Sequence, residues 1–320
     1  GGRRNNTVAF SRGRRVFLSQ HLGDLSTPAA LDGHRRSTHD FRRIYDVRPA
    51  AAACDLHPDY GSTATAHELG VPVVPVQHHV AHLFSAVLEH GLEPPVFAAS
   101  WDGTGAGVDG TVWGGEYLVW EGERVRRIGH LRPFRLPGGE QAVREPRRAL
   151  LGVAREMGRP ELARPHFSSE EWRVLERMLE RGLNSPWTTS AGRLFDAAAA
   201  LLGLCVRSSF EGEAAMRVEF AARGGAPEAA VEMEQDWAPL FETLADDSVP
   251  VARRAAMFHA TLASAVENAA RRARVEQVVL TGGCFQNALL AELAAERLRR
   301  AGFRVFLHRA LPPNDGGLAA

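Results

Sequence analysis

Along the first third of the chain, short runs of alternating apolar and polar residues predict strands, and longer amphipathic runs predict helices. Residues 7–10 and 15–19 read as two short strands around a glycine turn. Thr27 and Pro28 form a favourable N-cap and first-turn pair for a helix that we expect to reach about Tyr45. The next runs predict strands at 50–54, 71–77 and 96–101, and helices at 60–69 and from 78 to about 90. This alternation predicts a mixed sheet with helices packed on it.

The rest of the chain repeats this opening and then becomes mainly helical. Residues 111–120 and 125–131 predict a second pair of strands, and Ser168 with Glu171 forms a capping box at a helix start. Further patterns predict helices at 147–157, 168–181, 191–202, 213–222, 249–274 and up to about 300, and strands at 231–234, 277–281 and 304–307. Because the opening recurs around residues 8 and 97, we predict two lobes with a cleft between them. The lobes would be residues 1–96 and 97–320, with a helical insertion at about 135–225 in the second.

Composition excludes several classes of protein. The 320 residues include 38 Lys and Arg and 38 Asp and Glu, so no overall charge favours nucleic acid or an anionic membrane surface. Cys54, Cys205 and Cys284 form no Cys-x-x-Cys pair, which excludes a zinc ribbon or redox motif and favours a reducing, cytoplasmic compartment. The sequence has no apolar run of membrane-spanning length and no signal-peptide pattern. The chain starts without Met and stops after Ala320, so we expect it to be part of a longer protein.

The strongest chemical pattern is a pair of histidines at a predicted helix start. His78 and His82 are four residues apart, so both imidazoles project from one face of the helix. This spacing suits two nitrogen ligands of one transition metal, as in His-Glu-x-x-His, but the glutamate of the zinc proteases is missing. Two ordinary polar residues at a helix start are the alternative. Asp102, just after the next strand, favours the metal because its carboxylate can meet one at a glycine turn.

Glycine turns follow three of the predicted strands, at residues 102–105, 281–283 and 315–317. At each turn the backbone can approach a phosphate or a base because no Cβ stands in the way. None of the three matches a P-loop or a Rossmann fingerprint. Together they predict a nucleotide cleft that both lobes close.

Six short motifs occur together and in order across essentially the whole chain. They are QHHVAH at 77–82, SWDGTG at 100–105, GRLFD at 192–196, FEGEAA at 210–215, TGGCFQN at 281–287 and PNDGG at 313–317. Their combination resembles the C-terminal carbamoyltransferase module of the HypF family, which acts in [NiFe]-hydrogenase maturation. That module is similar to the catalytic subunit of tRNA threonylcarbamoyl transferase, and the resemblance implies the two-lobed actin/Hsp70/sugar-kinase fold, which is ribonuclease H-like.

The sequence departs from the family pattern in two places. Glu213 stands where Gln is more usual, which leaves its role open, and the last segment of the family module is missing. HypF proteins also have acylphosphatase-like, zinc-finger and YrdC-like adenylate-forming domains. None of these three is visible in this sequence.

The resemblance implies a catalytic metal site made by four side chains: His78, His82, Asp102 and Asp315. Two neutral nitrogens and two carboxylates suit zinc or iron(II). It also implies a bound nucleotide, which would be ATP, AMP or carbamoyladenylate. The residues implied for the nucleotide are Gly103, Thr104, Gly105, Asp196, Gly212, Gly283 and Asn287. Turn N–H groups would bind the phosphate, and the Asp196 carboxylate and Asn287 amide would bind the ribose or base.

The implied reaction is carbamoyl transfer from carbamoyladenylate to the C-terminal cysteine thiol of HypE, which then forms the thiocyanate used for cyanide ligands. The donor would come from the YrdC-like domain on the same full-length chain. Cys284 is not expected to be a nucleophile, because the implied acceptor thiol belongs to HypE. Three alternatives stay open: an O-carbamoyltransferase acting on a small hydroxylated metabolite, an actin-fold ATPase or kinase, and a non-catalytic nucleotide-binding scaffold. We expect no nucleic-acid partner and no membrane association.

Overall fold

The computed structural model describes residues 6–13, 15–223 and 230–320, and its main feature is a seven-stranded mixed sheet. Strand β5 (Val96–Ala106) lies inside this sheet, parallel to β10 (Gln277–Thr281) and antiparallel to β6 (Val112–Trp120). The other strands are β11 (Arg304–Leu307) beside β10, β7 (Val125–His130) beside β6, β8 (Phe134–Arg135) and β9 (Trp187–Thr188). The predicted mixed sheet is therefore present.

Strand β5 forms because its first residues are apolar or small and are buried on both faces of the sheet. Alternate side chains belong to different core clusters, with Phe97, Ala99 and Trp101 in the larger one and Val96 and Ala98 in the smaller one. Helix α3 (His78–His90) contributes to the smaller cluster, and α7 (Ala191–Leu201) and α10 (Val251–Ala273) contribute to the larger one. The sheet is thus covered on both faces.

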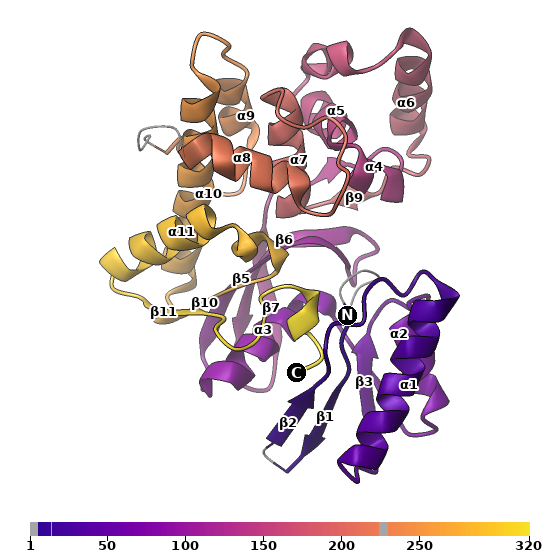
Figure 1. Ribbon diagram of the computed structural model, residues 1–320. Helices are drawn as coiled ribbons and strands as arrows, with labels where there is room; N and C mark the ends of the chain where they lie inside the picture. Colours follow the sequence, from indigo (N-terminus) through magenta and orange to yellow (C-terminus); the bar gives the residue numbers. More distant parts are fainter. Residues whose placement is uncertain (1–5, 14, 224–229) are drawn as a thin grey trace.

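Most of the helices form a separate layer at one end of the molecule (Figure 1). They are α4 (Glu140–Arg144), α5 (Pro146–Glu156), α6 (Ser169–Arg181), α7, α8 (Glu213–Arg223), α9 (Ala238–Leu244) and α10. The predicted capping box at Ser168 and Glu171 is present at the start of α6. Among the described residues, none of the helices is both long enough and apolar enough to cross a bilayer.

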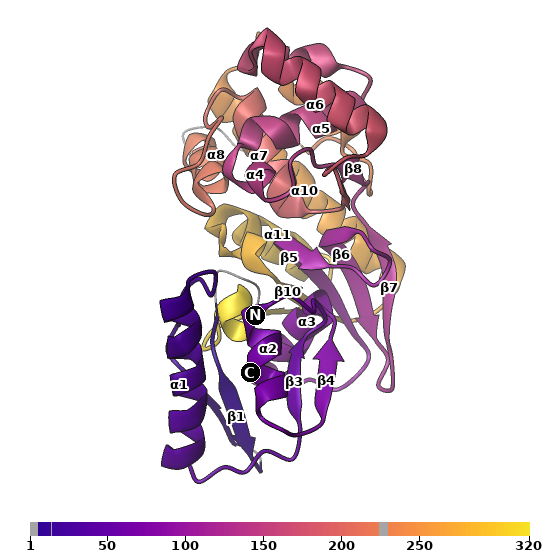
Figure 2. The ribbon, with the colours of Figure 1, turned by 90° about the vertical axis from the view of Figure 1, so that its right-hand side faces the viewer.

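The N-terminal part packs at the opposite end (Figure 2). It contains the antiparallel pair β1 (Ala9–Arg12) and β2 (Arg15–Leu18), the parallel pair β3 (Ala52–Asp55) and β4 (Val73–Val76), and the helices α1 (Pro28–Ile44) and α2 (Gly61–Glu68). Helix α11 (Ala288–Arg300) lies between β10 and β11 in the chain. Although α3 precedes the boundary predicted at residue 96, it packs on the seven-stranded sheet.

Two predictions about elements are wrong, and helix α9 was not predicted. The predicted glycine turn after Trp101 is a continuation of β5 to Ala106, because the chain absorbs the glycines in a register shift between Trp101 and Gly105. Residues 231–234 are irregular rather than a strand, since this stretch packs against helices instead of pairing with a strand. Helix α9 was not predicted, since it is only seven residues long and begins directly after Trp237, with Pro239 in its first turn.

Candidate metal centre

The two histidines of the site project from the first turns of α3, whose ends the sequence specifies. The Gln77 side chain caps the helix by accepting hydrogen bonds from the His79 and Val80 amides at 2.7 and 3.0 Å. Gly91 ends the helix in the left-handed conformation with a φ of 59°. The face that bears His78 and His82 is turned inward, so both imidazoles are buried.

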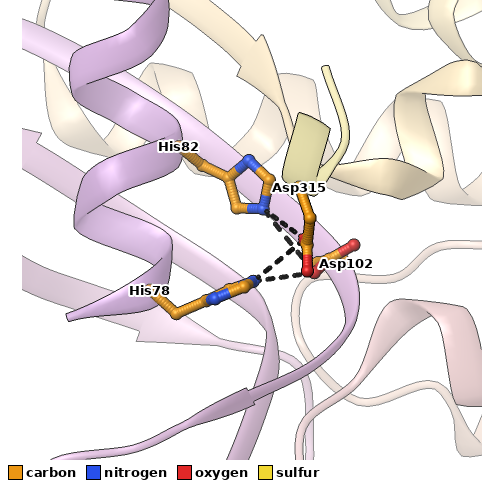
Figure 3. Close-up of side chains that lie close together, drawn as sticks. All are labelled: His78, His82, Asp102 and Asp315. Atoms are coloured by element: carbon orange, nitrogen blue, oxygen red, sulfur yellow. Dashed lines mark hydrogen bonds and ion pairs between the residues drawn. The ribbon is translucent and has the colours of Figure 1, made fainter. Parts of the chain in front are cut away.

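Four side chains from three separate parts of the chain meet here (Figure 3). His78, His82, Asp102 of β5 and Asp315 at the start of the 3-10 turn η4 (Asp315–Gly317) each offer a ligand atom, and these atoms all lie within 4.8 Å of one another. His78 Nε2 lies 3.1 Å from Asp102 Oδ2 and 3.3 Å from Asp315 Oδ1. His82 Nε2 lies 3.6 Å from the same two oxygens. The structure thus brings together the four residues that the resemblance implies.

Burial and charge act in opposite directions on these groups. Burial lowers the pKa of His78 and His82, but the two carboxylates outweigh it and raise both, the pKa of His78 well above its usual value. Burial likewise raises the pKa of Asp102 and Asp315, and the histidines reverse this, so both pKa values lie below the usual range. The centre therefore favours two carboxylates in contact with positive charge.

This donor set fits a divalent transition metal. His82 Nε2 is buried and has no hydrogen-bond partner among the described residues, although it points toward both carboxylates. A buried nitrogen without a partner is costly, and a metal ion would satisfy it. Two imidazoles and two carboxylates match the ligands of zinc or iron(II).

One functional residue of the centre was missed by sequence reasoning. Asp55, the last residue of β3, lies with Oδ2 at 2.8 Å from His78 Nδ1 and accepts the His57 amide on Oδ1 at 2.9 Å. An ionised carboxylate at Nδ1 holds the proton there and leaves Nε2 free to bind a metal. The only signal in the sequence was an aspartate at the end of a predicted strand.

The comparisons with known proteins identify the family of this chain. Residues 98–320 match the family described as "Carbamoyltransferase, Kae1-like Domain, second subdomain", and residues 1–89 match the "HypF Kae1-like domain". The chain belongs to the HypF carbamoyltransferase family. HypF2 of Cupriavidus necator is 39% identical over 100% of this chain, and a HypF homolog of the same organism is 37% identical over 98%.

Solved HypF structures confirm the predicted fold class. Full-length HypF in a phosphate- and nucleotide-bound form matches 100% of this chain with a TM-score of 0.93 and 32% identity. HypF of T. kodakarensis matches it with a TM-score of 0.91 and 30% identity. The chain covers 45% of HypF2 and 44% of the full-length HypF structure, but 87% of the C. necator HypF homolog. It thus spans less than half of the full-length relatives and most of a shorter one.

His79 lies between His78 and His82 in the sequence but is not part of the candidate metal centre. Gln77 uses its amide oxygen to cap α3, so its Nε2 donates to His79 Nδ1 at 3.2 Å and to the Ala106 carbonyl at 3.0 Å. Burial lowers the pKa of His79 well below its usual value. His79, a neutral ring held by Gln77, is not one of the four side chains that meet at the candidate metal centre.

The residues expected to bind a nucleotide lie in several environments. Gly105 is packed against the histidines, since a Cβ there would come within 2.7 Å of His79 Cε1 and 2.8 Å of His78 Cδ2. The Gly283 amide donates to Asp102 Oδ1 at 3.0 Å, which leaves Oδ2 facing the histidines. Gly103 lies beside the N-terminus of α7, and Thr104 is exposed. Gly105 and Gly283 thus shape the candidate metal centre itself.

Asp196 and Asn287 are buried and already have partners. The Arg193 Nε lies 3.0 Å from Asp196 Oδ2, but neither atom has hydrogen-bond geometry, and burial raises the pKa of Asp196 to about 6 against the effect of Arg193. Asn287 accepts the Leu290 amide at 2.9 Å as the N-cap of α11, and its Nδ2 lies 3.0 Å from His259 Nε2. Asn287 is therefore a helix cap, whatever else it binds.

Two further residues of the HypF motifs, Gly212 and Glu213, lie at the start of α8. Gly212 is exposed with a φ of 81° and precedes Glu213. Hydrogen bonds from the Ser209 hydroxyl and amide, together with Arg217, lower the pKa of Glu213 to about 2.

Burial raises the pKa of the Cys284 thiol well above its usual value, which makes it a poor nucleophile.

Proposed function

We propose that this HypF-family chain transfers the carbamoyl group of carbamoyladenylate to the C-terminal cysteine thiol of HypE, in the synthesis of cyanide ligands for [NiFe]-hydrogenase. The observation that carries the proposal is the convergence of His78, His82, Asp102 and Asp315 in a chain of this family. A site with two histidines also distinguishes the chain from actin-fold kinases, because Mg²⁺ prefers oxygen ligands.

The reaction forms one bond and breaks one. The thiol sulfur bonds to the carbamoyl carbon, the bond from that carbon to the phosphate oxygen breaks, AMP leaves with the electron pair, and the thiol proton passes to solvent. A bound zinc or iron(II) ion would withdraw charge from the leaving phosphate. The chain's own residues hold the ligands in place: Asp55 orients His78, and the Gly283 amide orients Asp102.

The proposed nucleotide position is the surface next to Asp102. The solved HypF relative in its phosphate- and nucleotide-bound form supports nucleotide binding by this family. Gly103 and Gly283 leave backbone close to Asp102, and the buried Nη1 atom of Arg193 has no hydrogen-bond acceptor among the described residues. We propose that these groups receive the phosphate and ribose of the adenylate.

The proposed partners are HypE and a YrdC-like domain. Full-length HypF relatives are more than twice as long as this chain, which supports an adenylate-forming domain elsewhere in the protein. The shorter C. necator homolog, of which this chain covers 87%, supports testing the module by itself. Preformed carbamoyladenylate replaces the missing step in such a test.

The deciding experiment is mass spectrometry of the HypE C-terminal peptide after incubation with preformed carbamoyladenylate and this chain. We expect a thiocarbamate mass shift on the terminal cysteine, which falls by orders of magnitude with Asp102→Asn and is unchanged by Asp24→Asn on the surface. A shift no larger than that without enzyme, while metal and nucleotide are both bound, would overturn the proposal. Transfer to a small hydroxylated metabolite instead would favour an O-carbamoyltransferase.

A further inference from the structure

The segment that leads to Asp315 is fixed to the last turn of α3 by one carboxylate. Glu89 Oε1 accepts the amides of Arg309 and Ala310 at 2.8 and 2.6 Å, and its Oε2 lies 3.2 Å from His308 Nδ1. The adjacent His90 Nε2 donates to the Leu307 carbonyl at 2.8 Å. Residues 307–310 are therefore all attached to the end of the helix whose start carries both histidine ligands.

Hydrogen-bond accounting assigns the proton of His308. Glu89 is ionised, since hydrogen bonds from the two amides lower its pKa against the effect of burial, so it can only accept. Burial lowers the pKa of His308 to about 4, so the ring is neutral. Its one N–H is therefore assigned to Nδ1, which donates to Glu89, while Nε2 lies 2.8 Å from the Thr281 hydroxyl oxygen.

Through Thr281, these contacts connect His308 to α3 at a second point, near His82. The Thr281 hydroxyl donates to the backbone carbonyl of His82 at 3.0 Å, so Thr281 lies between His308 and a candidate ligand residue. The order Thr281, His308, Glu89 resembles a hydrolase triad. However, Thr281 is fully buried and no substrate can reach its hydroxyl, so the arrangement is structural rather than nucleophilic.

We propose that Glu89 is a positioning residue that fixes Asp315 against His78 and His82 and thereby sets the affinity of the centre for its metal. The inference deepens the proposed function and rests on it, because it requires that the four side chains bind a metal. Asp315 is the one ligand candidate that lies neither on α3 nor on a strand.

The segment from 311 to 314 has no helix or strand of its own, so its two ends determine where Asp315 lies. At the far end, the Gly282 amide donates to the Pro313 carbonyl at 3.0 Å, and the Thr7 hydroxyl donates to the Gly316 carbonyl at 2.9 Å. At the near end, Glu89 receives the two consecutive amides of Arg309 and Ala310. Without this carboxylate the segment would be held only at its far end, and the additional ordering required when metal binds would weaken binding.

The test compares the wild-type chain with Glu89→Ala, Glu89→Gln and the matched control Glu93→Gln. Glu93 is four residues further on and exposed, and its side chain has no interaction partner among the described residues. Zn²⁺ and Co²⁺ affinities are measured by competition with a chromophoric chelator. We expect Glu89→Ala to weaken binding by roughly 10- to 100-fold, as loss of outer partners does at metal sites. Glu89→Gln should weaken it less, since an amide oxygen still accepts two N–H groups, and Glu93→Gln should match the wild type.

A second readout needs no metal. Amide hydrogen exchange of the metal-free protein should speed up at Arg309 and Ala310 in Glu89→Ala, while α3 and β10 exchange as in the wild type. Should Glu89→Ala fail to fold, the isosteric Glu89→Gln decides.

Failure of the positioning role of Glu89 and failure of the proposed metal site give different results. If the wild type binds Zn²⁺ and both Glu89 variants bind it equally tightly, the positioning role is overturned and the metal site stands. If the wild type binds neither ion, the proposed function fails, and this inference fails with it.

Discussion

Substitution of His82 is the most direct test of the proposed metal site. Its Nε2 is buried, points toward two carboxylates and lacks a hydrogen-bond partner among the described residues, so a cation is the simplest way to satisfy it. We predict that His82→Ala leaves the fold intact and weakens Zn²⁺ binding by more than about 100-fold. This loss exceeds the effect of removing a residue that only hydrogen-bonds a metal ligand.

Elemental analysis of protein purified without chelator measures this loss, with circular dichroism to verify the fold. The control is His39→Ala, since His39 is an exposed residue of α1 far from the centre in sequence. Equal zinc or iron in wild type and His82→Ala would mean that the site is wrongly assigned.

Asp196 gives a prediction about pH. Burial raises its pKa from 3.8 to about 6 in the folded chain, with Arg193 opposing the shift. The folded state therefore binds a proton more tightly than the unfolded state, and this stabilisation is complete below pH 3.8 and lost as pH rises through 6. The difference between the two pKa values corresponds to about 3 kcal/mol.

Asp196→Asn lacks this titration and keeps the shape of the side chain. We predict that the unfolding free energy of the wild type, minus that of Asp196→Asn, is larger at pH 4.5 than at pH 8 by about 2 kcal/mol, because pH 4.5 already lies above the unfolded pKa. Urea unfolding at a series of pH values measures it. A difference that does not change with pH would show that Asp196 titrates alike in the folded and unfolded chain.

At the scale of elements, the sequence predicts what depends on neighbouring residues and misses what depends on distant ones. The ends of α3 follow from Gln77 and Gly91, which act within one turn of the helix. The continuation of β5 through its glycines was not predictable, because it depends on pairing with β6 and on the rings of α3. Asp55 was missed for the same reason, since only the fold brings it to His78, 23 residues away.

The irregular end of β5 packs against the rings of His78 and His79. A substitution at Gly105 tests this contact. A Cβ at Gly105 would lie 2.7 to 2.9 Å from the rings of His79 and His78, both of which are buried and cannot easily move. We predict that Gly105→Ala destabilises the chain by roughly 1–3 kcal/mol, as overpacking does, and weakens metal binding as well.

Chemical denaturation and metal competition measure the two effects. The control is Gly33→Ala in α1, where the added Cβ meets open space and should stabilise the helix by roughly 1 kcal/mol. Wild-type stability and affinity in Gly105→Ala would show that the histidine rings are not held where β5 places them.

At the scale of the whole molecule, the centre lies where the N-terminal part meets the seven-stranded sheet. Asp55 comes from the small parallel sheet of the N-terminal part, the histidines and Asp102 from α3 and β5, and Asp315 from near the C-terminal end of the chain. The Thr7 hydroxyl, which donates to the Gly316 carbonyl, adds a contact between the two ends. The site is therefore assembled only in the complete fold.

This assembly predicts a division of labour. The proposed metal ligands, Asp55 and the adjacent glycines all lie within residues 55–315 of this chain. The activation of carbamate is proposed for a YrdC-like domain, and the chain spans 45% of HypF2. We predict that the chain, given ATP and carbamoyl phosphate, releases no pyrophosphate above a no-enzyme control.

Addition of a YrdC-like domain in trans, with carbamate supplied as ammonium bicarbonate, should start pyrophosphate release, and addition of HypE should then yield the carbamoylated cysteine. The matched control is the same mixture with His82→Ala, which should still release pyrophosphate but give little carbamoylated HypE, because only the transfer step uses the metal centre. Pyrophosphate release by this chain alone would contradict the division, since the chain would then have to bind ATP and carbamate in one site. A loss of pyrophosphate release in the His82→Ala mixture would contradict it as well, because the metal centre would then serve activation.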